Sequence, residues 1–342
     1  MSMGRFLLKR SVQGVFVVWG VVTAVFALRY VTPGNPITFV APLDASQQLR
    51  EQIAQELGLN RPFYVQYFDY IFSLVQGDMG YSYIQGVEAS QLIFARLPAT
   101  LELAVAASIV AVVISIPLGV ISATRRHEPA DYAATSFSLV GISTPNFWLG
   151  IMLVLILSVQ FGLFPTSRRA VGFLESFGNL VVLSFDPLRF ALPLNVTEFF
   201  HDIVTWLAHI TLPAITLGTY FTALITRLTR SGMLDELGKP YVRSSRAKGL
   251  PETLVRYKHA LRNTLIPVIT VLGLQLGTLI GGAVITEAVF AWPGLGTLLI
   301  NAINSRDWPL IQGSLIVIGT GFVVINIFVD ALYAYINPQV VH

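Results

Sequence analysis

The chain has 342 residues, of which 54% are hydrophobic and 12% charged, and its formal net charge is +3. Soluble domains carry about 25% charged residues, so this composition argues against a soluble protein and predicts one embedded in a membrane. The absence of cysteine excludes disulfides, thiolate metal sites and cysteine nucleophiles.

Uncharged stretches along the chain predict six membrane-spanning helices. Six runs contain no Asp, Glu, Lys or Arg: 11–28, 103–124, 132–167, 203–226, 263–286 and 308–329. A helix needs about 20 apolar residues to cross the hydrocarbon core. Pro145 divides the long third run, so we expect one span there, preceded by an amphipathic approach. The first run follows a basic start but has no small-residue cleavage site, so we expect it to be retained as a span.

The basic residues predict the orientation of the spans. Fourteen of the 22 lysines and arginines lie before the first run and in the links after the second and fourth runs. Cytoplasmic loops carry an excess of Lys and Arg. We therefore expect an all-α integral membrane protein with six transmembrane helices and with the N- and C-termini in the cytoplasm.

Two long segments are expected on the outer side, 32–98 and 165–202. The first contains the amphipathic stretch QQLREQIAQELGL and ends at Pro98, so we expect short helices on the membrane surface. The second shows no clear pattern.

A basic segment interrupts the apolar sequence at 246–267, RAKGLPETLVRYKHALRNTLIP. Residues 241–248 predict a short helix that Gly249 ends in a left-handed conformation. Pro251 suits the first position of a second helix, with Glu252 in its first turn. On that helix an apolar stripe is expected at Leu250, Leu254, Tyr257, Leu261 and Leu265, opposite Glu252, Arg256, His259 and Asn263. The pattern indicates a cytoplasmic docking surface, although a loop whose charges only meet lipid headgroups remains an alternative.

Two further motifs follow in the chain. Gly273, Gly277 and Gly281 form a tandem G-x-x-x-G row, which lets helices approach closely. In VFAWPGLG, residues 289–296, Trp292 suits the interfacial aromatic belt and the Pro and Gly residues predict an anchored re-entrant turn rather than a solute contact.

The sequence contains no energy source of its own. Ion-coupled carriers place ionisable groups in mid-membrane, and the centres of the six runs have none. The stretch GMLDELGKP, from Gly232 to Pro240, has the wrong spacing for a phosphate-binding loop. Energy must therefore come from a separate protein, and the basic segment is the surface suited to receive it.

The segment PYVRSSRAKGLPETLVRYKHALRNTLIPVIT resembles the coupling loop of permease subunits in ABC importers, and most closely the dipeptide/oligopeptide group. In the wider family the loop carries Glu-Ala-Ala, three residues and Gly. Here Arg243, Ser244 and Ser245 replace Glu-Ala-Ala, Gly249 matches, and the later proline comes at Pro267. Further blocks in the same order resemble this group: GRFLLKRSVQGVFVVWGVVTAVFALRYVTPGNP, GDMGYSY, RLPATLELAVAASIVAVVISIPLGV, GISTPNFWLGIMLVLILSVQFGLFPTS, EAVFAWPGLGTLLINAINSRDWPLIQG and VDALYAYINP.

The resemblance implies the type I importer fold and a B-type subunit of a multi-pass cell-membrane complex. It divides the chain into 1–98, the first helix with an outer segment, and 99–336, a five-helix permease core. The core contains the coupling loop 231–262 and the outer insertion 165–202. The implied partners are a paralogous second permease, two ATP-binding-cassette ATPases, an extracytoplasmic solute-binding protein and membrane lipid, with no nucleic acid. No cofactor or metal is expected on this chain, because ATP and Mg would be held by the ATPases, and the chain itself is expected to be non-catalytic.

The resemblance also assigns roles to residues. Contact with the ATPases is expected at Arg243, Ser244, Ser245, Arg246, Ala247, Lys248, Gly249, Leu250, Arg256 and His259. The translocation path or the second permease is expected at Gly273, Gln275, Gly277, Thr278 and Gly281, with packing inside the chain as the alternative for the glycines. The binding protein is expected at Phe290, Trp292, Pro293, Gly294, Leu295 and Gly296.

Peptides are the expected solute, with nickel complexes, glutathione and oligosaccharides as alternatives in the same class. Two other classes were weighed. A stand-alone channel would need no partner. An intramembrane serine protease would use Ser143 and His209, which would have to lie within hydrogen-bond reach of each other.

Overall fold

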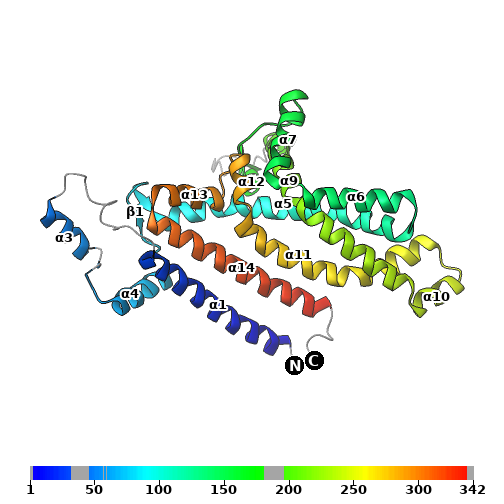
Figure 1. Ribbon diagram of the computed structural model, residues 1–342, viewed down its shortest axis with the longest axis horizontal. Helices are drawn as coiled ribbons and strands as arrows, with labels where there is room; N and C mark the ends of the chain where they lie inside the picture. Colours follow the sequence, from blue (N-terminus) through cyan, green and yellow to red (C-terminus); the bar gives the residue numbers. More distant parts are fainter. Residues whose placement is uncertain (1–2, 32–45, 57, 59, 181–195, 337–342) are drawn as a thin grey trace, which may run out of the picture.

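The computed structural model describes residues 3–31, 46–56, 58, 60–180 and 196–336, and within these ranges almost all elements are helices (Figure 1). In chain order they are α1 (Met3–Val31), α3 (Gln47–Glu56), α4 (Phe63–Val75), β1 (Tyr81–Ser82), β2 (Val87–Glu88), α5 (Ala89–Thr124), α6 (Pro129–Ser143), α7 (Asn146–Leu153), the π-helical η1 (Val154–Gln160), α8 (Phe173–Leu180), α9 (Val196–Leu237), α10 (Pro240–Ala247), the π-helical η2 (Leu254–Leu261), α11 (Arg262–Gly282), α12 (Val284–Val289), α13 (Leu295–Ser305) and α14 (Trp308–Ile336). The strands pair antiparallel, with Tyr81 opposite Glu88.

The described residues include five helices long and apolar enough to cross a membrane, and a bent pair that makes a sixth. The five are Gly4–Val31, Ala89–Thr124, Thr197–Leu237, Leu254–Leu279 and Trp308–Leu332. The structure therefore agrees with the six predicted spans when the bent pair is counted as one.

The bent pair is α6 with α7 and η1, and its two parts meet at 104°. The break falls at Pro145, as the sequence predicts. The Thr144 hydroxyl donates to the Val140 carbonyl at 2.8 Å or less, at 2.7 Å, so it covers a backbone group near the helix end.

The outer segments are more ordered than their sequences indicate. The predicted short helices of 32–98 include α3 and α4, while 32–45 lies outside the described residues. α5 begins at Ala89 and runs through Pro98. The division drawn between residues 98 and 99 therefore falls inside a helix. In 165–202, α8 and the start of α9 are described and 181–195 are not.

The core of the molecule is the contact between α5 and α9, which also includes α11. α5 presents small buried residues to it, namely Ala99, Ala104, Ala107 and Ala111. A Cβ at Gly119 would lie 2.6 Å from Cβ of Thr229, and a Cβ at Gly218 would lie 2.6 Å from the Ala107 carbonyl oxygen. The two backbones approach closely because these positions carry no larger side chain.

A second layer is formed by α1, α14 and α11, with α14 between the other two (Figure 1). The glycine row of α11 packs against α14 of the same chain. A Cβ at Gly273 would lie 2.2 Å from the Val329 methyl groups, and a Cβ at Gly277 would lie 3.0 Å from the Phe322 ring. For the glycines, the structure shows the packing inside the chain that the sequence left as an alternative.

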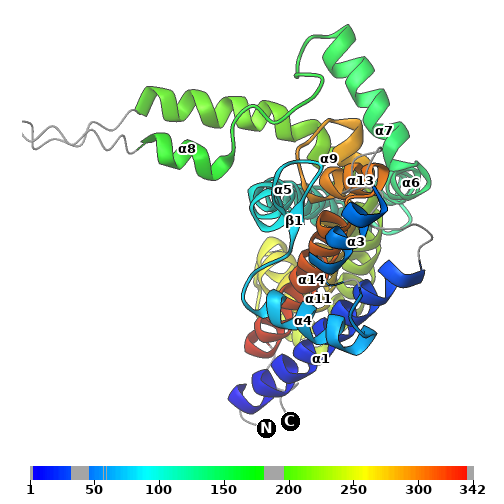
Figure 2. The same cartoon turned by 90° about the vertical axis from the view of Figure 1, so that its left-hand side faces the viewer.

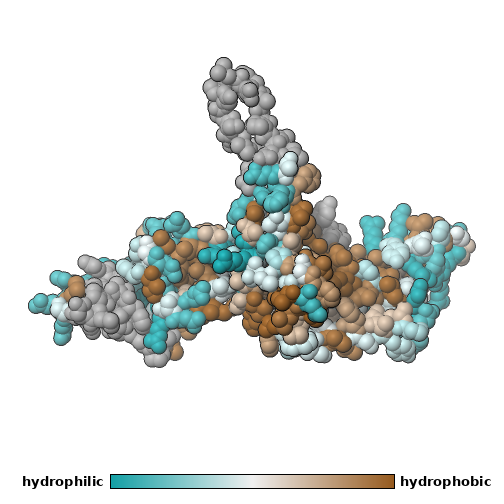
Figure 3. All heavy atoms as spheres, turned by 90° about the horizontal axis from the view of Figure 1, so that it is seen from above, coloured by the Kyte–Doolittle hydropathy of each residue, from teal (hydrophilic) through white to brown (hydrophobic). Residues whose placement is uncertain are grey.

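The two ends of the molecule differ in character. At one, the corner end, α10 and η2 extend beyond the helices; at the other, the turn end, lie β1, β2, α12 and α13 (Figure 1). Seen from above, hydrophobic side chains gather over the middle and hydrophilic ones around the corner end (Figure 3). α8 and the first part of α9 lie side by side and project sideways from the other helices (Figure 2).

The close contact at Gly273 can be tested by adding one methyl group. Gly273→Ala should lower the stability by about 1–3 kcal/mol, because the methyl group overlaps Val329 and forces both helices to shift. Gly281→Ala is the matched control, because its methyl group would meet Ile318 at 3.4 Å, an ordinary contact. Thermal unfolding of both variants in detergent measures the difference, and equal melting temperatures would contradict this packing.

Candidate functional site

The predicted corner in the basic segment is present and is built on Gly249. α10 ends at Ala247, and Gly249 has φ of +75°, the left-handed conformation predicted for it. The Gly249 N–H donates to the Arg246 carbonyl at 2.9 Å and the Leu250 N–H donates to the Ser245 carbonyl at 3.3 Å. A Cβ at Gly249 would meet nothing within 4 Å. Glycine is therefore required by the backbone conformation and not by crowding.

A fork of ion pairs closes the corner. The Arg246 guanidinium donates twice to the Glu252 carboxylate, from Nη2 at 2.8 Å and from Nε at 3.1 Å. Arg256 Nε donates to the same carboxylate at 3.1 Å. Hydrogen bonds from Arg246, with a smaller contribution from Arg256, lower the pKa of Glu252. One carboxylate thus ties the end of α10 to the start of the next helix.

A second network ties α10 to α9. The Tyr241 hydroxyl donates to Glu236 Oε2 at 2.5 Å and Asn263 Nδ2 donates to the Tyr241 oxygen at 3.0 Å. Lys239 Nζ pairs with Glu236 Oε1 at 2.6 Å. Tyr241 also lines a hollow of about 410 Å³ with Lys258, His259, Arg262, Asn263 and Ile266. The corner is therefore held on both sides.

Most of the predicted ATPase-contact residues lie at the surface of the corner. Arg243, Ser244, Arg246, Ala247, Lys248, Gly249 and Leu250 are exposed, whereas Ser245, Arg256 and His259 are half-buried. The structure brings these residues together, but their contact with another protein stays a prediction. Arg246 and Arg256 also have a role inside the chain, through Glu252.

The apolar stripe predicted on the second helix is only partly right. Leu254 and Tyr257 are exposed, and the residues buried against the protein are Val255 and Ala260. These two are five positions apart because η2 is π-helical, with i→i+5 hydrogen bonds that rotate the buried face away from an α-helical stripe. The helix begins at Glu252, one residue after the predicted Pro251.

A buried ion pair fixes the turn between α5 and α6, also at the corner end. Asp131 is 4% exposed and accepts from Arg230 Nε at 3.0 Å and Nη2 at 2.9 Å. The Ser122 hydroxyl and the His127 N–H donate to the same carboxylate. The cluster joins α5, α6 and α9, so the three helices end in a fixed arrangement.

At the turn end, VFAWPGLG forms a turn around a buried carboxylate. Glu287 is 0% exposed and accepts from Thr100 Oγ1 at 2.8 Å and from the Thr297 N–H at 2.9 Å. Burial raises the pKa of Glu287, while these hydrogen bonds oppose part of the rise. A Cβ at Gly294 would lie 2.1 Å from Glu287 Oε1, so the glycine leaves room for the carboxylate.

The predicted place of Trp292 in an interfacial belt is wrong. Its side chain is 0% exposed and its Nε1–H donates to the Ala99 carbonyl at 2.8 Å, inside the core formed with α5. Phe290, Gly294, Leu295 and Gly296 are also buried, and Pro293 is half-buried. The anchored turn is confirmed. A contact with a binding protein stays a prediction, and it would have to use Pro293 and its exposed neighbour Ala291.

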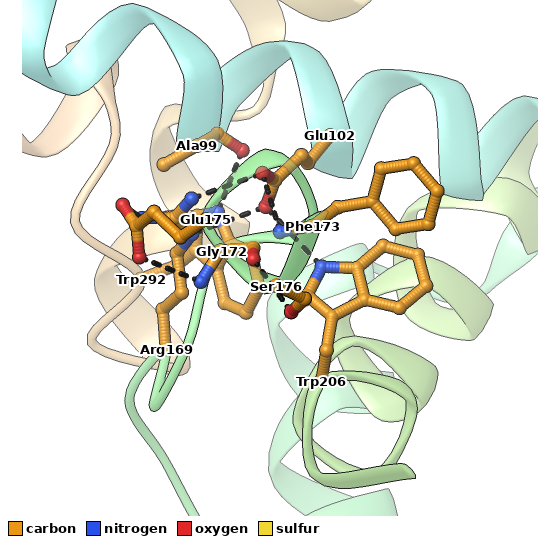
Figure 4. A network of polar contacts seen from close by, with 9 residues as sticks. All are labelled: Ala99, Glu102, Arg169, Gly172, Phe173, Glu175, Ser176, Trp206 and Trp292. Atoms are coloured by element: carbon orange, nitrogen blue, oxygen red, sulfur yellow. Dashed lines mark hydrogen bonds and ion pairs between the residues drawn. The ribbon is translucent and has the colours of Figure 1, made fainter. Parts of the chain in front are cut away.

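A polar network beside this turn was not predicted (Figure 4). The Glu102 carboxylate, on α5, accepts from Arg169 Nε at 3.1 Å, Arg169 Nη2 at 2.9 Å, the Phe173 N–H at 2.9 Å and Trp206 Nε1 at 3.2 Å. Glu175 adds a contact to Arg169 at 3.4 Å. The network anchors the start of α8 to α5 and α9. Only an interrupted uncharged pattern at Glu102 marks it in the sequence, because Arg169 follows 67 residues later.

The remaining predicted path residues lie on α11. Thr278 is exposed and donates to the Gln275 carbonyl at 2.8 Å, and Gln275 is half-buried. Both lie away from the glycine row that faces α14. Their place on a translocation path stays a prediction.

The buried indole of Trp292 provides a test of the turn. Trp292→Phe should destabilise the protein by about 1–3 kcal/mol, because it removes a buried hydrogen bond to Ala99 and leaves unfilled volume. Trp148→Phe is the matched control, because Trp148 is 49% exposed. Thermal unfolding in detergent compares the two, and a control as unstable as Trp292→Phe would contradict the assignment.

Comparisons with known proteins agree with this architecture. The family model described as "Binding-protein-dependent transport system inner membrane component" matches residues 115–342, and the model of the N-terminal part of such components matches residues 3–104. The chain is 39% identical over 339 residues to the oligopeptide transport system permease protein AppB of Bacillus subtilis, with 99% of each chain covered.

Two further relatives have the same extent. The chain is 39% identical over 342 residues to the dipeptide transport system permease protein DppB of Escherichia coli, covering 99% of each chain. It is 35% identical over 336 residues to the glutathione transport system permease protein GsiC of Escherichia coli, covering 98% of each. The chain therefore belongs to the family of inner-membrane components of binding-protein-dependent transport systems, in the group of the dipeptide and oligopeptide permeases.

Proposed function

We propose that the chain is the permease subunit of an ATP-driven importer and that it passes peptides across the membrane. Relatives of full length are named for oligopeptide and dipeptide transport, which supports this solute class. The family description supports an extracytoplasmic binding protein that delivers the solute. The chain itself is non-catalytic, and ATP and Mg are bound by separate ATPase subunits.

The observation that carries the proposal is the exposed corner at Gly249. It extends beyond the membrane-spanning helices, carries exposed cationic side chains and is tied to α9 and η2 on both sides (Figure 1). A surface held in this way can transmit movement of a bound ATPase to the spans, whereas a loop that only determines topology needs no such ties. The corner therefore lies on the cytoplasmic side and seats in a groove of the ATPase.

The ion pairs divide the basic residues of the corner into two groups. Arg246 and Arg256 are paired with Glu252, so their first role is to hold the corner. Among the described residues, Arg243 and Lys248 are exposed and form no ion pair. These two are therefore the cations that meet the ATPase.

A paralogous second permease completes the path. The exposed faces of α5, α6 and α11 supply the contact surface, and Gln275 and Thr278 lie where α11 is not covered by α14. The binding protein meets the turn end, where the buried Glu287 and Trp292 hold the turn for it.

The rival functions have less support. The relative named for glutathione transport keeps glutathione open as a solute, alongside nickel complexes and oligosaccharides. For a protease, His209 Nδ1 lies 2.8 Å from the Thr205 carbonyl oxygen, and no hydrogen bond joins it to Ser143 in the described structure. A stand-alone channel would leave the tied corner without a purpose.

Purification of the tagged chain in mild detergent, followed by mass spectrometry, tests the proposal. A second six-span protein and ATPase subunits should accompany the wild-type chain, and Gly249→Pro should lose the ATPases because proline cannot adopt a positive φ. Arg61→Glu is a control for charge reversal, because Arg61 lies on the α3–α4 link and not at the corner. Purification of the wild-type chain alone would overturn the proposal.

A charge swap separates the two roles of Arg246. Arg246→Glu places two carboxylates together at the corner and should reduce transport-coupled ATP hydrolysis severalfold in reconstituted complexes. The double variant Arg246→Glu with Glu252→Arg restores an ion pair and should recover most of the loss. Failure of the double variant to recover would show that Arg246 acts by direct contact with the ATPase.

A further inference from the structure

A polar hollow of about 320 Å³ lies at the turn end, where α1 ends, α4 crosses and α14 begins. Arg29, Tyr70, Ser73, Asp78 and Gln312 are among the side chains that line it. None of these residues belongs to the corner or to the VFAWPGLG turn. The hollow is therefore separate from the sites described above.

Arg29 is the cation of this hollow that has no anionic partner. Within the described part of the chain its guanidinium, which is half-buried, makes no ion pair. The second arginine of the hollow, Arg61, pairs with Asp69 at 2.8 Å, and Asp78 accepts from the Gly80 N–H at 2.8 Å. A partly desolvated guanidinium without a partner is unfavourable, so Arg29 is suited to an anion from outside the chain.

Tyr70 adds a second unused donor to the same hollow. Its hydroxyl is buried and has no hydrogen-bond partner in the structure. Buried polar atoms are nearly always paired, so one without a partner calls for a ligand or an ordered water. A guanidinium and a hydroxyl that face one hollow together suit an oxyanion better than a lone water molecule.

The surrounding side chains place the hollow at the depth of lipid headgroups. The Phe26 ring lies 5.3 Å from the rings of Tyr30 and Phe63, 5.2 Å from Tyr67 and 5.4 Å from Tyr70. Aromatic residues gather at this level at both faces of a membrane. The hollow also lies beside the end of α1, which is long enough to span the hydrocarbon core.

An apolar groove of about 720 Å³ adjoins the hollow, because Met79 lines both. Side chains of α1, α4, α5 and α14 line the groove, and Thr320 is the one hydroxyl among its lining residues. Along α1 it extends from Val15 to Val22, about 10 Å of helix, within the roughly 15 Å of one leaflet of the hydrocarbon core. A free phosphate ion would have no use for such a groove, but an acyl chain would.

From these observations we propose that the hollow and groove form a phospholipid site. The phosphate of the headgroup accepts hydrogen bonds from Arg29 and Tyr70, and an acyl chain of the same lipid lies in the groove. The lipid thereby joins α1 and α4 to α5 and α14. This site does not depend on the proposed solute or on the ATPase contact.

Native mass spectrometry of the delipidated full chain, titrated with phosphatidylglycerol, tests the site. Arg29→Gln should weaken binding about tenfold or more, because a charge-assisted hydrogen bond is lost, and Tyr70→Phe severalfold. Tyr70→Phe removes one oxygen atom only, so it serves even if Arg29→Gln folds poorly. Arg61→Gln is the matched control, since Arg61 already has Asp69 as its partner, and it should bind as the wild type does.

A second series distinguishes a lipid from a free anion. Val18→Trp fills the groove and should weaken phosphatidylglycerol binding, while millimolar inorganic phosphate should not displace the lipid. Displacement by inorganic phosphate, with no effect of Val18→Trp, would identify a free-anion site and overturn the lipid proposal. Unchanged binding in both Arg29→Gln and Tyr70→Phe would also overturn it.

Discussion

The close contact between α5 and α9 is the constraint on which the other features depend. Lipid tails are as apolar as leucine side chains, so helices inside a bilayer gain little from burying apolar surface and associate through tight packing. Here the alanines of α5 and the glycines Gly119 and Gly218 let the two backbones approach. With that distance set, Thr100 and Glu102 of α5 reach the turn end. At the other end Ser122 of α5 lies beside Arg230 of α9, where both contact Asp131.

The ionisable groups follow from the same constraint. A charge in mid-membrane is unfavourable, and the carboxylates that tie segments together lie instead at the two ends of the α5–α9 pair. Glu102 and Glu287 hold the turn end, and Asp131 and Glu236 hold the corner end. α9 spans the whole distance, with 42 residues from the projecting arm to the corner. A displacement of the corner therefore acts on the helix that also carries Trp206, one of the donors to Glu102.

Local patterns predicted the parts of the fold that local physics determines. Exclusion of charge from the bilayer marks the spans, and the conformation of Gly249 needs no distant partner, so both were recognised from the sequence. Contacts between distant segments left no such mark. The sequence therefore gave no indication that Trp292 is buried against Ala99 or that Arg169 pairs with Glu102. The π-helical winding of η2, which shifts the buried face to Val255 and Ala260, likewise depends on the packing around it.

The corner shows why counting basic residues overstates a docking surface. An exposed ion pair stabilises a protein by at most about 1 kcal/mol, and the groups of the Glu252 fork are each about 40% exposed. The fork therefore adds little to global stability. Its effect is on order: it joins the two helices that flank Gly249, the residue where the chain could most easily bend. A surface that is already in its binding conformation loses less entropy when a partner binds. Arg246 and Arg256 can thus strengthen docking without touching the partner, which leaves the direct electrostatic contact to the unpaired Arg243 and Lys248.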